Sequence, residues 1–128
     1  MSESEKLTIN MGVVDLGKID LLVQEGFYAN RTDFIRTSVR NHLDKHGAET
    51  QTAVKRHSAG IGIFHCSKQS LEKALSEGKR VSFSVIGMLH IDDSVSAELA
   101  NDTIESIRLW GVLRASDGVK KIVADRMI

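Results

Sequence analysis

The stretch KLTINM, residues 6–11, alternates apolar and polar side chains with the period of a β-strand. The apolar face would carry Leu7, Ile9 and Met11, and the polar face Lys6, Thr8 and Asn10. Gly12 ends the alternation, and no hairpin partner follows nearby. Because a strand must pair its backbone N–H and C=O groups, this one needs a partner from elsewhere.

Directly after this strand the period changes to that of a helix. In VVDLGKIDLLVQEG, residues 13–26, apolar residues recur every three or four positions, with charged residues opposite. The apolar set is Val13, Leu16, Ile19, Leu22 and Val23. Gly17 within this helix costs about 1 kcal/mol relative to alanine, and Gly26 is expected to end the helix.

A second helix is expected to begin at Asn30, whose side chain can cap it, with Asp33 forming a capping-box-like pair. Its buried stripe would be Phe34, Ile35, Val39 and Leu43. Gly47 is expected to close the helix. The order in residues 6–47 is therefore strand, helix, turn and helix.

A unit of this size buries too little surface to be stable alone, and its strand has two open edges. Pairing with a second copy solves both problems, because it makes a two-stranded antiparallel ribbon over four helices. KLTINM and residues 13–43 resemble the ribbon-helix-helix fold of the CopG/Arc/MetJ superfamily of DNA-binding regulators, in which the ribbon of a dimer enters the major groove. The resemblance covers roughly the first third of the chain.

The resemblance assigns roles by position. Lys6, Thr8 and Asn10 would face base edges, because lysine donates to guanine, asparagine pairs with adenine, and threonine offers a hydroxyl and a methyl group. Asn30, Arg31 and Thr32 would hold a phosphate at the start of the second helix. Acidic residues outnumber basic ones by seven to six in residues 1–46, so attraction to DNA must come from a local surface.

The rest of the chain contains an internal repeat. After residues 48–60, expected to be a linker or a partial helix, three segments align at a fixed step of 24 residues: 61–75, 85–99 and 109–123. The aligned columns include Ile63, Gly87 and Gly111, and also Leu71, Val95 and Val119. Each copy predicts a strand, a polar turn and a helix, and hence parallel strands joined by crossovers. Both a compact α/β layer and a short solenoid-like stack fit this pattern.

Two details of the repeat lead to further expectations. Asp92 and Asp93 are expected to lie at the N-cap of the second helix. The apolar positions of that helix would be Val95, Leu99, Thr103, Ile104 and Ile107. Trp110 is expected to pack against its neighbours, or to mark an interface if it is exposed.

The sequence predicts no metal, cofactor or catalytic site. His65 and Cys66 are neighbours on an expected strand and so face opposite sides of it. Together with His57 and His90 they lack the clustered spacing of the nickel-responsive regulators in this superfamily. No glycine-rich phosphate loop, histidine–glutamate zinc pattern or nucleophile elbow occurs.

Composition sets the broad class. A hydrophobic content of 41%, a charged content of 27% and zero formal net charge are typical of a folded, soluble protein. One cysteine and the polar start MSESEK favour the cytoplasm over secretion, and no apolar run is long enough to cross a membrane. We predict an α+β protein with a ribbon-helix-helix domain (1–47), a linker (48–60) and an α/β repeat domain for oligomerisation or sensing (61–128).

The function predicted from these features is sequence-specific DNA binding by a transcriptional regulator, by default a repressor. It would act as a homodimer, tetramer or higher assembly in the cytoplasm, on the nucleoid of a bacterium or archaeon. Three alternatives stay open: an antitoxin that binds a toxin and represses its own operon, a repressor that responds to a metal or a small effector, and a structural assembly protein that polymerises through the repeat. Double-stranded DNA and a second copy of the chain are the expected partners.

Overall fold

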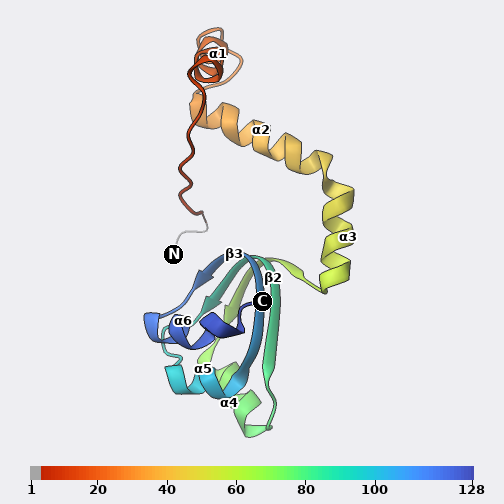
Figure 1. Cartoon of the computed structure of the whole chain (residues 1–128), viewed down its shortest axis with the longest axis vertical. Coiled ribbons are helices and arrows are strands. Elements are labelled where there is room, and N and C mark those ends of the chain that lie inside the picture. Colours follow the sequence, from red (N-terminus) through yellow and green to blue (C-terminus); the bar gives the residue numbers. More distant parts are fainter. Residues whose placement is uncertain (1–3) are drawn as a thin grey trace. The chain divides into compact units, whose positions relative to one another are not determined.

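The computed structural model describes residues 4–128 and divides the chain into two compact units, Met1–Thr52 and Ala53–Ile128 (Figure 1). Each unit is described by itself. No helix in the described part of the chain is long and apolar enough to span a bilayer.

The first unit contains two helices, α1 (Val13–Gln24) and α2 (Arg31–Lys45). Residues 4–12, which include the predicted strand 6–11, precede them without regular secondary structure. No strand of the described residues pairs with this segment, and a strand forms only when its backbone groups are paired. Helix α1 ends as predicted, because Gly26 adopts a φ of +86°. Its N–H donates to the carbonyl of Val23 and that of Phe27 to the carbonyl of Leu22, at 3.1 and 3.0 Å. These two bonds close the last turn of the helix.

Helix α2 begins at the predicted cap, since the Asn30 side chain accepts a hydrogen bond from the N–H of Asp33. The helix ends at Lys45, but Gly47 does not terminate it by a left-handed turn. Instead, helix α3 (Gly47–His57) starts directly after the bend at His46. Most of the segment expected to be a linker or a partial helix is therefore helical.

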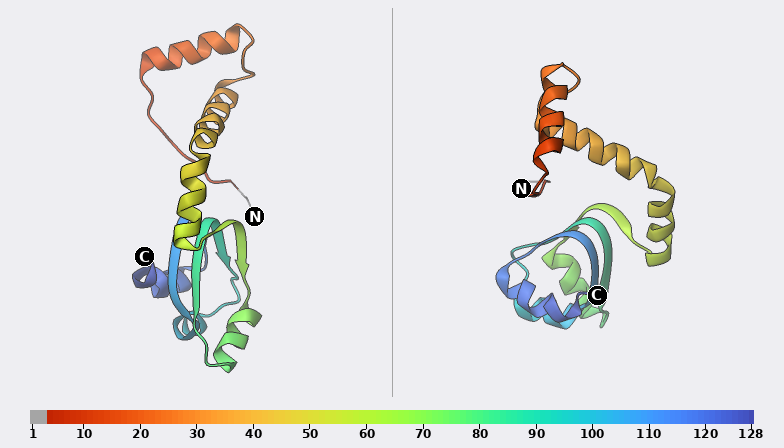
Figure 2. Two further views of the ribbon diagram at one scale, coloured as in Figure 1. Left: turned by 90° about the vertical axis from the view of Figure 1, so that its right-hand side faces the viewer. Right: turned by 45° about the horizontal axis from the view of Figure 1, so that its top comes forward.

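The second unit is built around a three-stranded parallel sheet in the order β1-β2-β3. Its strands are β1 (Gly60–Cys66), β2 (Val81–Ile91) and β3 (Ile104–Arg114). The helices after them are α4 (Lys68–Ser76), α5 (Ala97–Thr103), α6 (Asp117–Val123) and the short 3-10 helix η1 (Ala124–Arg126). Parallel strands joined by helices confirm the predicted crossovers. The helices α4, α5 and α6 lie on one side of the sheet (Figure 2).

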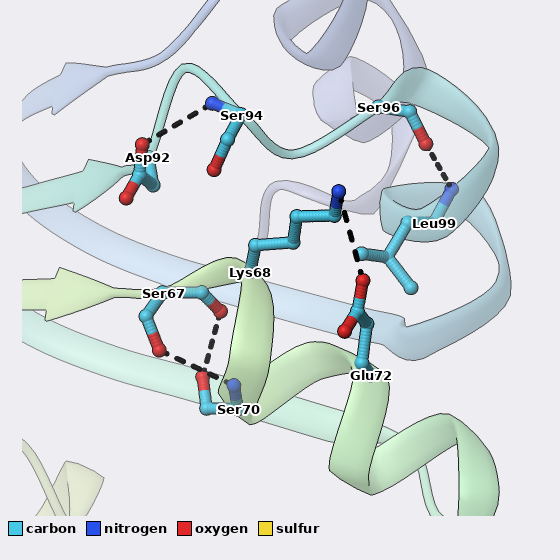
Figure 3. Close-up of polar contacts among 8 residues, drawn as sticks. All are labelled: Ser67, Lys68, Ser70, Glu72, Asp92, Ser94, Ser96 and Leu99. Atoms are coloured by element: carbon cyan, nitrogen blue, oxygen red, sulfur yellow. Dashed lines mark hydrogen bonds and ion pairs between the residues drawn. The ribbon is translucent and has the colours of Figure 1, made fainter.

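Each of the three helices after a strand starts at a serine cap. Ser67, Ser96 and Ser116 accept hydrogen bonds from the N–H groups three residues further on. Figure 3 shows the first two of these caps. The prediction that Asp92 and Asp93 cap the second helix is therefore wrong: Asp92 accepts the N–H of Ser94 in a turn that precedes the helix (Figure 3). The physical reason is that residues 92–95 form a turn, closed by the hydrogen bond from the Val95 N–H to the Asp92 carbonyl at 3.0 Å, so the helix begins only after Ser96.

The core lies between the three helices and one face of the sheet. Leu71 of α4, Leu99 of α5 and Val119 of α6 pack there with Leu89 of β2 and Ile107 of β3. Alternate strand residues face the other way, and there Ser82 contacts Ser106 and His65 contacts His90. We call this second side, which no helix of α4–α6 covers, the open face.

The strand register corrects the repeat. Gly62, Gly87 and Gly111 lie side by side, so Gly62 rather than Ile63 belongs in the glycine column. The step from β1 to β2 is 25 residues (62 to 87) and that from β2 to β3 is 24 (87 to 111). A sequence alignment at constant step cannot detect the extra residue, because turn length does not change the pairing of the strands.

The boundary between the second helix and the third strand is also earlier than expected. Helix α5 ends at Thr103, so Ile104 and Ile107 belong to β3 and not to the helix. Both are fully buried and pair with residues at the start of β2. A β-branched residue fits this buried sheet position well, which explains why the helix stops.

Candidate nucleic-acid interface

The residues predicted to read bases are accessible. Lys6, Thr8 and Asn10 are exposed on the segment that precedes α1. Leu7, on the opposite side of the alternation, is 84% exposed. An apolar side chain gains stability only when something covers it, and nothing within the described part of this unit covers Leu7. Pairing of this segment with a second copy stays a prediction, and the exposure is what that prediction requires.

The start of α2 presents backbone N–H groups. The Asn30 side chain accepts the N–H of Asp33 at 2.8 Å, and the Asp33 carboxylate accepts the N–H of Ala29 at 2.9 Å. The N–H groups of Arg31 and Thr32, in the first turn, have no partner inside the helix. They are available to an anion at the positive end of the helix dipole.

Arg31 has a partner that the sequence reasoning missed. Its Nε and Nη2 donate to the two carboxylate oxygens of Asp20 at 2.7 and 2.8 Å, joining α2 to α1. The hydrogen bond from Arg31 lowers the pKa of Asp20 from its ordinary value of 3.8. Eleven residues separate the two in sequence, so no helical spacing rule could reveal the pair. Arg31 must share or leave Asp20 to hold a phosphate.

The two helices of the first unit do not enclose a core. Ile19 is the one buried residue that they contribute. A pocket of about 430 Å³ opens next to Ile19. It is lined by the apolar residues Met11, Ile19, Leu22 and Phe34 and by the charged residues Asp15 and Lys18. The exposed apolar residues of these helices and the turn between them are Val13, Val14, Leu21, Phe27, Val39 and Leu43. Nothing in residues 4–52 covers this apolar surface.

The first unit thus contains an alternating polar and apolar segment followed by two helices, and the apolar surface of these helices is uncovered within residues 4–52. The sequence profile of the Ribbon-Helix-Helix transcriptional regulator family matches residues 2–120. The chain belongs to this family. The match extends through β3 and into α6, so the sheet unit is part of the region that the profile describes. No curated protein and no solved structure matches the chain.

This ribbon-helix-helix protein also carries a histidine pair on the open face of its sheet. His65 and His90 occupy the same register position on β1 and β2. Nδ1 of His90 lies 3.1 Å from Nε2 of His65, so one nitrogen donates and the other accepts. Within residues 4–128, no three histidine, cysteine or carboxylate side chains are grouped to hold a metal ion.

Cys66 lies on the opposite side of β1 from His65, as expected for neighbours on a strand. It is 3% exposed and belongs to the core between sheet and helices. Burial raises the pKa of the thiol, which disfavours the thiolate that a nucleophile or metal ligand needs. The position of Cys66 therefore fits a small core residue.

Trp110 both packs and remains accessible. Its ring centroid lies 4.9 Å from that of His57, at the end of α3, while 42% of the residue is exposed. Sequence reasoning placed Trp110 on a strand but did not connect it with His57, which lies 53 residues earlier in the chain. Nor did it single out Arg108, which lies beside His57 on the same face.

Proposed function

We propose that the protein is a sequence-specific DNA-binding repressor that acts as a homodimer. Two copies of residues 6–11 form an antiparallel ribbon that enters the major groove. The observation that carries this proposal is the uncovered apolar surface of the first unit, which encloses only Ile19 in residues 4–52. A second copy covers this surface and supplies the missing strand partner in one step.

In this dimer the ribbon reads base edges through Lys6, Thr8 and Asn10. Their exposure and their alternation with Leu7, Ile9 and Met11 support this role. Each type of side chain has a complementary pattern in the major groove. Asn30, Arg31 and Thr32 hold a phosphate at the start of α2, which sets the register of the ribbon without reading sequence.

The sheet unit joins dimers into a higher assembly. Its open face carries exposed apolar residues on the two outer strands, with Ile61 of β1 58% exposed and Trp110 of β3 42% exposed. The outer edge of β1 is unpaired within the described residues. An apolar face next to an open strand edge favours association with another copy. Joined dimers would occupy several half-sites together and gain affinity without new base contacts.

The reading of bases is tested by comparing two double variants. Thr8→Ala/Asn10→Ala removes two of the three proposed base contacts, and Ser38→Ala/Asn41→Ala is the matched control on the exposed surface of α2. Binding to a pool of genomic fragments should lose its sequence preference in the first variant and keep it in the second. The first variant should keep weak, salt-dependent binding, because its phosphate contacts are retained. Identical sequence preference in the first variant and in the wild type would refute ribbon readout.

Dimerisation is tested by measuring the solution mass of the full chain and of Leu21→Asp. The substitution places a charge on the exposed apolar surface of α1, where a dimer would bury it. The wild type should have a mass of at least twice 14.1 kDa. The mutant should fall to a lower oligomeric state and bind DNA more weakly. A wild-type monomer that is folded over its first unit would rule out the ribbon.

A further inference from the structure

Polar side chains gather in the sheet unit where the end of α3 meets the open face of β2 and β3. A pocket of about 240 Å³ opens there. Its polar lining residues include Ser82, Ser84, Ser106, Arg108 and His57, and Ile128 is an apolar residue beside them. The pocket is open to solvent and has room for a small molecule.

Arg108 carries the positive charge of this pocket without a carboxylate to balance it. In the described part of the chain its one polar contact is with His57, whose Nδ1 lies 3.3 Å from its Nη1. Arginine can only donate, so His57 Nδ1 accepts and carries no proton in this contact. Arg108 is half-buried, and partial removal from water strengthens the attraction of its guanidinium for an anion. Most of its five N–H donors remain available to a ligand.

The three serines supply neutral hydrogen-bonding groups around that charge. Ser106 donates to Ser82 at 3.1 Å, and Ser84 donates to the carbonyl of His57 at 3.0 Å. Ser82 in turn contacts the carboxylate of Glu105 at 3.4 Å. Glu105 is exposed and is not among the residues that line the pocket. Hydroxyl groups can rotate to meet a new acceptor, so they fit an oxygen-rich anionic group.

We propose that this pocket binds a small organic carboxylate with a short apolar portion. The guanidinium fork of Arg108 matches two carboxylate oxygens, which neither an amide nor an alcohol can imitate. The hydroxyls of Ser84 and Ser106 add neutral contacts, and Ile128, which also lines the pocket, covers the hydrocarbon part. An anion of this kind supplies the counter-charge that Arg108 lacks.

The ligand would contact the last residue of α3, the helix through which the chain passes from the first unit to the second. Binding at this point makes the carboxylate an effector of the regulator, a consequence that rests on the proposed DNA binding. The binding itself can be measured without DNA. Failure of this inference is therefore distinguishable from failure of the proposed function.

Trp110 is the protein's only tryptophan and its ring lies 4.9 Å from that of His57, so its fluorescence reports on the pocket. The full chain is titrated with acetate, butyrate and benzoate, with neutral butyramide and benzamide, and with inorganic phosphate. At least one carboxylate should give a saturable change, at least tenfold tighter than its amide and tighter than phosphate. No saturable response to any carboxylate, by fluorescence and by calorimetry, would overturn the proposal. An equal response to the amides, or tighter binding of phosphate, would also overturn it.

Variants then locate the binding site. Arg108→Gln should weaken carboxylate binding at least tenfold, while Arg114→Gln, further along the same strand and on the same face, should leave it unchanged. Should Arg108→Gln fail to fold, as judged by circular dichroism, Ser106→Ala and Arg108→Lys replace it. The first should weaken binding at least twofold and the second at least threefold, because lysine loses the two-oxygen geometry. Wild-type affinity in the folded Arg108 variant refutes the assignment.

Discussion

Replacing Gly87 by alanine should destabilise the sheet unit strongly, and the structure separates two causes. Gly87 has a φ of +134°, a region that only glycine occupies readily. An alanine there costs about 1–3 kcal/mol in backbone strain. In addition, its Cβ would lie 3.1 Å from the carbonyl carbon of Gly62 on β1 and still closer to the oxygen. The two strands would have to separate at this register position.

Separation breaks one or two ladder hydrogen bonds, each worth about 1 kcal/mol. The total for Gly87→Ala is therefore about 2–5 kcal/mol. Gly62 is the matched control, because its φ of +142° is similar but an added Cβ would meet nothing nearer than a Phe64 side-chain atom at 3.8 Å. Gly62→Ala should show the strain alone, about 1–3 kcal/mol.

The assay is urea unfolding followed by Trp110 fluorescence, at one protein concentration because association affects apparent stability. Trp110 lies in β3 and so reports on the sheet unit. Gly87→Ala should be less stable than Gly62→Ala by at least 1 kcal/mol, with the denaturant slope unchanged. Equal stability losses in the two variants would show that close strand contact at the glycine column is not what makes glycine necessary.

Three further predictions concern single side chains. Leu89→Ala, at a fully buried core position, should lower the free energy of unfolding by about 2–5 kcal/mol, measured by the same unfolding assay; a loss under 1 kcal/mol would contradict the packing described. The Asp20 carboxyl should titrate below 3.8 by NMR and return toward 3.8 in Arg31→Gln, because Arg31 lowers its pKa. Because the Asp20 pKa is lower in the folded state, the ion pair stabilises the fold at pH above 3.8, and this stabilisation is lost as the pH falls through the lowered pKa. An Asp20 titration that is the same in Arg31→Gln and in the wild type would exclude the ion pair. Cys66 should react slowly with a thiol reagent in the native protein and rapidly in urea, since burial raises its pKa, and rapid native reaction would count against the buried position.

The local signals in the sequence were dependable where the structure is local. Gly26 ends α1 and Asn30 caps α2, because a left-handed glycine and a capping side chain act on neighbouring backbone groups. The prediction for Asp92 was wrong because a carboxylate can accept a nearby backbone N–H both in a turn and at the start of a helix. The residue type and its place in the sequence are the same in the two cases. Only the position of Ser96 in space distinguishes the two.

The sequence alone therefore determined the order of helices in the first unit, the parallel strand–helix repeat in the second, and the family to which the resemblance points. Tertiary structure decided the 25-residue step that aligns Gly62 with Gly87, the pairing of Arg31 with Asp20, and the meeting of His57 with Arg108. These features join residues that are far apart in the chain. Their contacts depend on strand register and helix packing. Both are set by many interactions across the whole unit, so they produce no periodic pattern in the sequence.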